Sequence, residues 1–259
     1  MTLTSRSRIV VHRLMNRFLG TNKPLHRILP DDIFLCSFPR SGNTWIRLML
    51  AYYLSPDKKC DPRSVHAIIP DVHSGDIDTL TEVPRPRIIK SHFTPIHEYP
   101  RIIYLVRDGR DVCVSYYDLC IKKYGYKADF EDFVKDLCAG RLFPSPWHIH
   151  VMEWLQKSDT KPLLFVRYED ILVDPAGELA KMLRFAGYET DGEKLKSAVE
   201  NTRLETIWSQ IRATPENQAV GFAGGVSGKA GKWREVFSDS LHSFFLDVSG
   251  RALKRCGYV

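Results

Sequence analysis

The chain has 259 residues, 44% of them hydrophobic, which is enough for one sizeable globular domain with an ordinary core. Its 37 basic and 31 acidic residues give a net charge of +6, which suits an anionic partner. We expect that partner not to be nucleic acid, because no basic run is interleaved with regularly spaced aromatics and no zinc-finger motif is present.

Residues 1–28 are predicted to form an amphipathic helical segment, ahead of a single domain that spans residues 29–259. An apolar stripe runs from Val11 to Phe18 at helical spacing, and arginines make the rest of this segment basic. We favour a helix that packs on the domain, because short amphipathic helices usually serve a core. The alternative is peripheral contact with an anionic membrane, which would bring the chain to a lipid.

The stretch from residue 33 to residue 52 is predicted to form a strand, a tight turn and a helix. Residues 33–38 read as a buried strand, and apolar residues recur at helical spacing over residues 45–52. Backbone N–H groups at the start of a helix bind anions, and this turn adds a charge and two hydroxyls from Arg40, Ser41 and Thr44. The turn has one glycine and no lysine, so it is not a Walker A loop, and a plain helix cap is the alternative interpretation.

Three later segments, 87–92, 101–107 and 163–170, also read as strands, and helical patterns lie between them. This alternation predicts a single α/β domain with a central parallel β-sheet flanked by helices. Ligands of such sheets bind at the carboxyl ends of the strands, where polar and aromatic side chains gather in this sequence. Those side chains are Lys90, His92, Arg107, Ser115 and Tyr168.

Two long irregular segments, residues 55–86 and 209–232, are expected to be lids or walls of a substrate site, because long loops in a compact domain usually have such roles. The first segment is expected to form the pocket for a second substrate together with residues 120–146. The second segment is rich in glycine, which allows its backbone to fold over a ligand at low steric cost.

The cellular location is predicted from cysteine usage and from the absence of targeting signals. The six cysteines include no Cys-x-x-Cys pair, which favours reduced thiols. No apolar stretch reaches the roughly 18 residues of a membrane span, and the N-terminus lacks a signal-peptide core. We therefore expect a cytoplasmic protein.

The motifs resemble those of the sulfotransferase family that uses 3′-phosphoadenosine 5′-phosphosulfate (PAPS). Family members have a Pro-Lys-Ser-Gly-Thr-Thr-Trp loop that resembles a P-loop, a Lys-Thr-His after a strand, an Arg and a Ser eight positions apart, and a Tyr-Glu-Asp followed by Asp-Pro. The corresponding residues here are Pro39 to Trp45, Lys90-Ser91-His92, Arg107 with Ser115, and Tyr168-Glu169-Asp170 with Asp174-Pro175. The resemblance covers most of the chain, and it extends to Trp147, His150 and Trp154, which we interpret mainly as packing residues.

The resemblance implies a donor site at the helix N-terminus and the strand ends. The loop that would hold the 5′-phosphosulfate consists of Arg40, Ser41, Gly42, Asn43 and Thr44. Arg107 and Ser115 would bind the 3′-phosphate through a charged fork and a hydroxyl. Trp45 and Tyr168 would flank the adenine.

The resemblance also implies the catalytic groups. Lys90 and Arg40 would neutralise the charge that develops on oxygen as the S–O bond of the donor breaks. His92 would take the proton of the acceptor, and an ordinary pKa of about 6.5 suits that task. No carboxylate cluster lies near the loop, so we expect no metal.

The chain departs from the family pattern at several positions. Arg40 stands in place of the loop lysine and Asn43 in place of a threonine. After Thr202, Leu204 stands where the family has an adenine-stacking phenylalanine. The arginine and lysine of the C-terminal clamp on the 3′-phosphate are missing around Gly228, so we predict that Lys229 or Lys232 replaces them. The family's dimerisation pattern is absent from residues 234–243, which leaves the oligomeric state open.

We therefore predict a PAPS-dependent sulfotransferase, which transfers a sulfuryl group to a hydroxyl or amine of a small-molecule, glycan or lipid acceptor. One alternative is a P-loop nucleotide kinase, which would need Mg²⁺ and a carboxylate ligand for it. Another is a nucleotide-binding module without catalytic activity, supported by the altered clamp. The identity of the acceptor cannot be predicted, because loops of unknown shape set that specificity.

Overall fold

The computed structural model describes residues 28–58, 60–62, 64–73, 83, 85–95, 98–203, 205–207, 209 and 228–259. The predictions for the N-terminal segment before residue 28 and for Leu204 lie outside the described residues. The same holds for much of the two irregular segments expected to form lids or walls.

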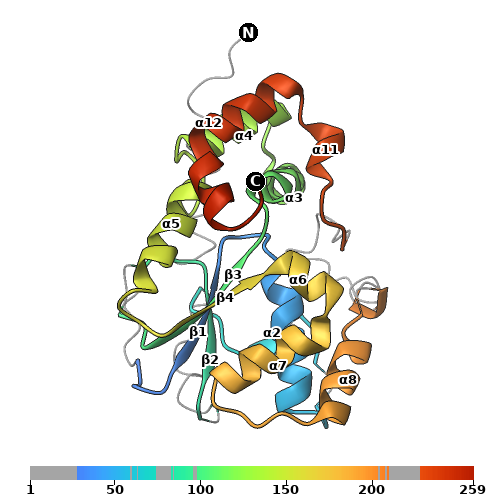
Figure 1. The fold of residues 1–259 in the computed structure, drawn as a ribbon. Helices are drawn as coiled ribbons and strands as arrows, with labels where there is room; N and C mark the ends of the chain where they lie inside the picture. The colour runs from blue at the N-terminus through green and yellow to red at the C-terminus, as the bar shows by residue number, and fades with distance from the viewer. Residues whose placement is uncertain are drawn as a thin grey trace.

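Four parallel strands form the centre of the molecule (Figure 1). They are β1 (Ile33–Ser37), β2 (Ile88–Ser91), β3 (Arg101–Val106) and β4 (Leu163–Arg167), in the spatial order β2-β1-β3-β4. β1 and β3 are nearly continuous apolar runs because both faces of the sheet are covered by helices, whereas β2 ends in the polar residues Lys90 and Ser91. The predicted α/β domain with a central parallel sheet is confirmed.

Alternate residues of each strand pack into two separate hydrophobic cores. On one face, the side chains of Leu35 and Leu105 pack with α2 (Asn43–Leu54), α7 (Pro175–Phe185) and α8 (Gly192–Asn201). On the other face, Phe34 and Tyr104 pack with α3, α4, α5 and α12. Those helices span Gly109–Tyr124, Phe130–Cys138, Trp147–Lys157 and Asp239–Arg255.

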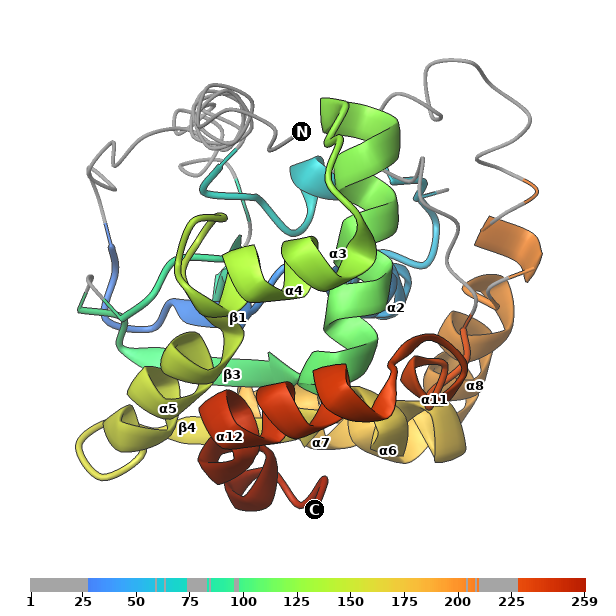
Figure 2. The ribbon, with the colours of Figure 1, turned by 90° about the horizontal axis from the view of Figure 1, so that it is seen from above.

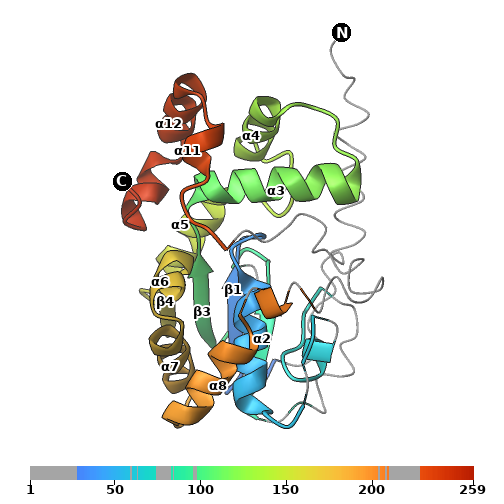
Figure 3. The same cartoon turned by 90° about the vertical axis from the view of Figure 1, so that its right-hand side faces the viewer.

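Some of the helices lie at one end of the sheet and others lie along its side. Figures 1 and 3 show α3, α4 and α12 beyond the carboxyl ends of the strands, whereas α2, α7 and α8 lie alongside the sheet. Figure 2 shows α11 (Trp233–Val236) close to the start of α3. The short elements η1 (Ser64–Ala67) and α6 (Tyr168–Val173) complete the described fold.

Short polar residues set where the helices begin. The side chains of Asp108, Asp129, Asp174, Asp191 and Ser238 accept hydrogen bonds from first-turn N–H groups of α3, α4, α7, α8 and α12. Trp147, His150 and Trp154 are buried in the core, as expected for packing residues. All six cysteines are free. Among the described residues, no helix combines the length and the apolar character needed to cross a membrane.

A buried ion pair joins the starts of β1 and β2. Arg87 donates from Nε to Asp32 Oδ1 at 2.7 Å and from Nη2 to Asp32 Oδ2 at 2.5 Å. Both side chains are almost fully buried, and Asp32 also accepts from the Leu29 N–H at 2.7 Å. Removing one partner of such a pair leaves an uncompensated charge in the interior.

We predict that Asp32→Asn lowers the free energy of unfolding by about 3 kcal/mol or more, because the Arg87 charge stays buried without its counter-ion. Urea denaturation of both proteins measures the difference. The matched control is Asp31→Asn, which breaks the adjacent exposed ion pair with Arg85 and should leave the unfolding midpoint nearly unchanged. Equal midpoints for the two variants would show that the buried pair is not a determinant of stability.

Candidate functional site

The turn between β1 and α2 has the backbone shape of an anion-binding loop. Arg40 and Gly42 have positive φ angles of 70° and 94°. Gly42 caps α2, and its carbonyl accepts from the Trp45 N–H at 3.0 Å. The first N–H groups of any helix have no partner within the helix, so they are available to a ligand. Thr44 and Trp45 lie on this first turn and are partly buried.

Several polar atoms around the loop are buried without a hydrogen-bond partner among the described residues. They are Ser41 Oγ, Asn43 Oδ1 and Arg107 Nε. Buried polar atoms are almost always hydrogen-bonded, so two unpartnered donors beside a helix N-terminus mark the place of an anionic ligand. Asn43 uses its other amide atom, because Nδ2 donates to Ser37 Oγ at 3.0 Å. The residues present therefore fit a phosphate- or sulfate-bearing group.

Two arginines from different segments meet beside the loop. Arg107, at the end of β3, donates from Nη1 to the Arg40 carbonyl at 3.3 Å, and its guanidinium lies 4.7 Å from the ring centre of Tyr168. Arg40 donates from Nε to Ser115 Oγ at 3.0 Å. Burial and the charge of Arg107 lower the pKa of Arg40 to about 10, so Arg40 stays charged at neutral pH. Arg40, Arg107 and Ser115 thus form one positively charged cluster.

The predicted aromatic residues lie against the same loop. Tyr168 is buried, and a Cβ atom on Gly42 would lie 2.5 Å from its ring. The rings of Trp45 and Tyr168 are 6.2 Å apart in an edge-to-face arrangement. Trp45 Nε1 donates to the Thr202 carbonyl at 2.9 Å, whereas the Thr202 hydroxyl donates to the Ala198 carbonyl at 2.7 Å. Thr202 therefore orients Trp45 through its backbone.

The segment that begins at Gly228 is fixed to the start of α3. Asp111 accepts from the Gly231 N–H at 2.6 Å and from the Trp233 N–H at 3.0 Å. The Lys229 carbonyl accepts from Arg107 Nη2 at 3.2 Å. Sequence reasoning missed Asp111, whose position in the first turn of a predicted helix gives no signal of this long-range contact.

His92 is held in one tautomer by the end of β1. Its Nδ1 lies 2.7 Å from the Ser37 carbonyl, which can only accept, so Nδ1 carries the proton and Nε2 is the unprotonated acceptor of the neutral ring. Burial, the charge of Lys90 and the neighbouring His73 hold the pKa of His92 well below its ordinary value. The imidazole is therefore neutral at pH 7 and able to accept a proton at Nε2.

Residues of α5 hold the backbone around His92. His150 Nε2 donates to the His92 carbonyl at 3.3 Å, and Trp154 Nε1 donates to the Phe93 carbonyl at 3.1 Å. The Tyr104 hydroxyl lies 2.8 Å from His150 Nδ1 and is its donor. Burial lowers the pKa of His150 to about 4, so this ring is also neutral. The packing residues of the sequence analysis thus also position the candidate base.

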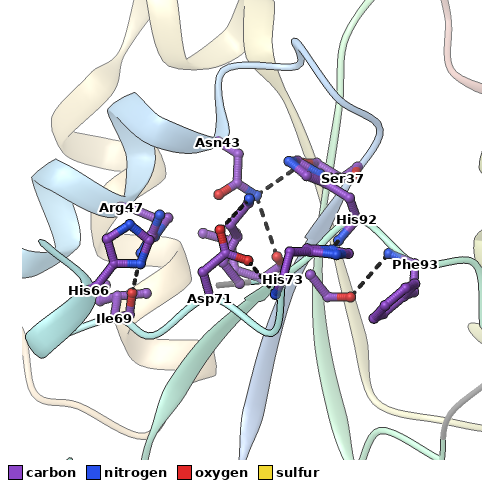
Figure 4. Close-up of polar contacts among 12 residues, drawn as sticks. Ser37, Asn43, Arg47, His66, Ile69, Asp71, His73, His92 and Phe93 are labelled. Carbon is purple, nitrogen blue, oxygen red and sulfur yellow. Dashed lines mark hydrogen bonds and ion pairs between the residues drawn. The ribbon is translucent and has the colours of Figure 1, made fainter. Parts of the chain in front are cut away.

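Two further residues, Asp71 and His73, lie near His92 (Figure 4). Asp71 Oδ2 is 2.6 Å from Lys90 Nζ, and His73 Nε2 accepts from the His92 N–H at 2.8 Å. The ring of His73 lies against those of Phe93 and Phe143, so the first irregular segment meets residues 120–146 at this point. Sequence reasoning missed Asp71 and His73, because the segment that contains them has no periodic pattern.

The site combines a positively charged cluster, a lysine and a neutral histidine at the carboxyl ends of β1, β2 and β3. Such an arrangement can bind an anion, stabilise developing negative charge and remove a proton. Within the described parts of the chain, no group of three or more His, Cys, Asp or Glu side chains is placed to hold a metal ion.

Comparison with known proteins gives one family. The model of the sulfotransferase domain matches residues 30–257. Sulfotransferase 1E1 of Rattus norvegicus is 31% identical over 254 residues, which cover 88% of this chain and 85% of the relative. Sulfotransferase 1A1 of Bos taurus is 29% identical over 241 residues, which cover 83% of this chain and 81% of the relative.

Solved structures show the same fold. The mouse sulfotransferase SULT7A1, complexed with PAP, has a TM-score of 0.69 at 20% identity and covers 98% of this chain and 94% of its own. Retinol dehydratase, in a complex with retinol and PAP, has a TM-score of 0.65 at 23% identity and covers 88% of this chain and 82% of its own.

We predict that Gly42→Ala lowers the free energy of unfolding by more than Gly125→Ala does. Both glycines have positive φ, which costs an alanine about 1 kcal/mol, but only at Gly42 would the new methyl group meet an aromatic ring. The clash adds roughly 1–3 kcal/mol. Urea denaturation of the two variants separates the clash from the backbone strain, and equal losses would contradict the tight contact between Gly42 and Tyr168.

Proposed function

The chain belongs to the sulfotransferase family, and on that premise we propose that it moves the sulfuryl group of PAPS to a hydroxyl or amine of an acceptor, with His92 as the general base. The proposed acceptor is a small molecule, a glycan or a lipid. Similar folds hold PAP in mouse SULT7A1 and PAP with retinol in retinol dehydratase, which supports a donor that contains adenosine 3′,5′-bisphosphate and a hydroxyl-bearing acceptor.

The observation that carries the proposal is the tautomer of His92. A general base must present an unprotonated nitrogen to the acceptor and must be neutral at the working pH. The Ser37 carbonyl fixes the proton on Nδ1, and burial keeps the pKa of the ring low. A histidine that only filled space in the core would not need a fixed tautomer within the electrostatic reach of Lys90 at the carboxyl end of β2.

Each group of the site has a distinct role in the transfer. PAPS, when bound, supplies an activated sulfuryl group. His92 accepts the acceptor proton at Nε2 as the acceptor oxygen or nitrogen forms its bond to sulfur. Lys90 and Arg40 would stabilise the negative charge that develops on oxygen as the S–O bond of the donor breaks, because fixed positive charges in a buried site act strongly on developing negative charge.

The donor-binding residues are proposed from the same geometry. Ser41 Oγ and the N–H groups at the start of α2 hold the 5′-phosphosulfate, and Arg107 holds the 3′-phosphate with its free Nε donor. Trp45 lies beside the adenine, and Thr202 orients Trp45. Gly228 and Lys229 close the site from the C-terminal side, since the Lys229 backbone already contacts Arg107.

We predict that Arg107→Ala weakens the binding of 3′-phosphoadenosine 5′-phosphate by about ten- to a hundredfold and barely changes the binding of 5′-AMP. A charge-assisted hydrogen bond contributes roughly 1.5–3 kcal/mol, and only the first nucleotide has the 3′-phosphate. Isothermal titration calorimetry in excess EDTA measures all four affinities. Lys229→Ala and Lys232→Ala, alone and together, show by the same method whether either lysine contributes.

The control for this experiment is Arg85→Ala, which removes an exposed arginine from the other end of the strands and should change neither affinity. Loss of the preference for the 3′-phosphate in the control would point to a general effect of charge. Tighter binding of ATP with Mg²⁺ than of the 3′-phosphorylated nucleotide would instead favour a nucleotide kinase. Binding of PAPS without transfer to any acceptor would favour a module that has lost catalytic activity.

We predict that His92→Ala lowers turnover by about a hundredfold or more and leaves the affinity for 3′-phosphoadenosine 5′-phosphate nearly unchanged. The measurement is transfer from labelled PAPS to a panel of phenols, sterols, sugars and lipids. In the wild-type enzyme, turnover should persist as the pH falls through 6.5 and decline only below it, because the pKa of His92 is lowered and the base stays neutral. His148→Ala, on the same helix as His150, is the control and should remain active.

A fully active His92→Ala enzyme would contradict the assignment of His92 as the base. An acid limb at pH 6.5 or above would contradict the environment that the structure gives to the ring.

A further inference from the structure

Asp71 forms a buried ion pair with the proposed catalytic lysine. Its Oδ2 atom lies 2.6 Å from Lys90 Nζ, and about a tenth of each side chain is exposed. A second hydrogen bond holds the carboxylate, because Asp71 Oδ1 accepts from the His73 N–H at 3.0 Å. The carboxylate is therefore fixed at both oxygens.

The backbone of Asp71 is paired with the edge of the sheet. Lys90 and Asp71 form a parallel bridge, in which the Lys90 N–H donates to the Pro70 carbonyl at 2.8 Å and the Val72 N–H donates to the Lys90 carbonyl at 3.1 Å. Paired residues of neighbouring strands point to the same face of a sheet. The side chains of Asp71 and Lys90 are therefore brought together by the register of the backbone and not by a mobile surface contact.

A second cation lies behind Asp71. Arg47 is a buried residue of α2, and its Nη2 atom donates to the Ile69 carbonyl. The same Nη2 atom lies 3.3 Å from His66 Nδ1. Figure 4 shows Asp71 between the Arg47 and His66 side chains on one side and the His73 and His92 rings on the other. Burial alone would raise the pKa of Asp71, but the charges of Lys90 and Arg47 hold it well below its usual range. The carboxylate is therefore ionised throughout the working pH range.

We infer that Asp71 is a positioning residue for sulfuryl transfer. It holds the Lys90 ammonium group at the end of the strand by occupying one of its three N–H groups. The other two N–H groups are then directed to PAPS. This inference rests on the proposed function. An ammonium group on a four-carbon stem has many rotamers, and fixing it before the reaction avoids that cost in the transition state. Nothing in the sequence motif around Lys90 supplies this partner.

Asp71 also determines the protonation state of Lys90. Burial lowers the pKa of Lys90, the Asp71 carboxylate raises it, and the positive charges of Arg47 and Lys123 lower it. His92, whose pKa is held well below its ordinary value, and His73 face the same region. Removing the Asp71 carboxylate therefore lowers the pKa of Lys90 further. As the pH rises, Lys90 then loses its charge at a lower pH than in the wild-type protein.

The test compares Asp71→Asn with the wild-type enzyme. We predict that kcat falls roughly ten- to a hundredfold, that the dissociation constant of 3′-phosphoadenosine 5′-phosphate changes much less, and that the basic limb of the kcat profile moves to lower pH. Asp71→Glu, which keeps the carboxylate, should restore part of kcat. In the background Lys90→Met, Asp71→Asn should cause little further loss, because the pair acts as one unit.

A second readout does not depend on turnover. NMR titration of the lysine 13Cε signals, with Lys90 assigned by its loss in Lys90→Met, should show a lower pKa for Lys90 in Asp71→Asn than in the wild type. Glu131→Gln, which breaks an exposed pair with Lys135 on α4, is the control and should change neither kcat nor this titration. If the wild-type protein transferred no sulfuryl group, the proposed function would fail while the titration still measured the coupling.

Two results would overturn the inference. One is an Asp71→Asn enzyme with the kcat and the Lys90 titration of the wild type. The other is an equal loss of kcat in the presence and absence of Lys90, which would show that Asp71 only supports the fold.

Discussion

The parallel register of β1 against its two neighbours is the constraint on which the site depends. Cys36 pairs with Ser91 of β2 and with Tyr104 of β3, so the next residue of β1, Ser37, lies level with His92. The Ser37 carbonyl can therefore accept from His92 Nδ1 and fix the tautomer of the proposed base. The same register brings the end of β3, and with it Arg107, beside the loop that leaves β1. A slip of one residue would turn every strand side chain to the opposite face and separate these groups.

The electrostatics of the site follow from this convergence. Arg40, Lys90, Arg107 and Arg47 approach one end of the sheet from different segments, and burial weakens the screening of their charges by water. Asp71 offsets part of this positive charge at Lys90. Asp111 instead accepts hydrogen bonds from backbone N–H groups of the C-terminal segment. An anion that bound at this excess of positive charge would stabilise the folded protein, because its charge is attracted to the cluster and the cluster exists only in the folded state.

The features that could be predicted from the sequence are those encoded by neighbouring residues. Apolar runs indicated the four strands. The polar residues Arg40, Lys90, His92 and Arg107 lie at or just after the ends of these runs, which predicted that they gather at the carboxyl ends of the strands. The parallel sheet and the family are confirmed. Asp71, His73 and Asp111 could not be predicted in this way, because their partners lie between 19 and 122 residues away in the sequence and meet them only once the chain is folded. Thr202 is a different case. The sequence pointed to this position, but the Thr202 hydroxyl donates a hydrogen bond to the Ala198 carbonyl of the preceding helix.

The segment that contains Asp71 also contacts aromatic side chains near His92. Asp71 and His73 are two residues apart, and the His73 ring lies 4.4 Å from Phe93 and 6.1 Å from Phe143, measured between ring centres. The His73 Nε2 atom also accepts from the His92 backbone, so one short segment contacts Lys90, His92 and two aromatic rings. If the proposed acceptor meets these rings, an ill-fitting acceptor that displaced the segment would shift Lys90 and His92 together. Under the proposed function, discrimination between acceptors would then act on the rate of transfer as well as on acceptor affinity, because the segment that meets the acceptor would also hold the reacting groups in place.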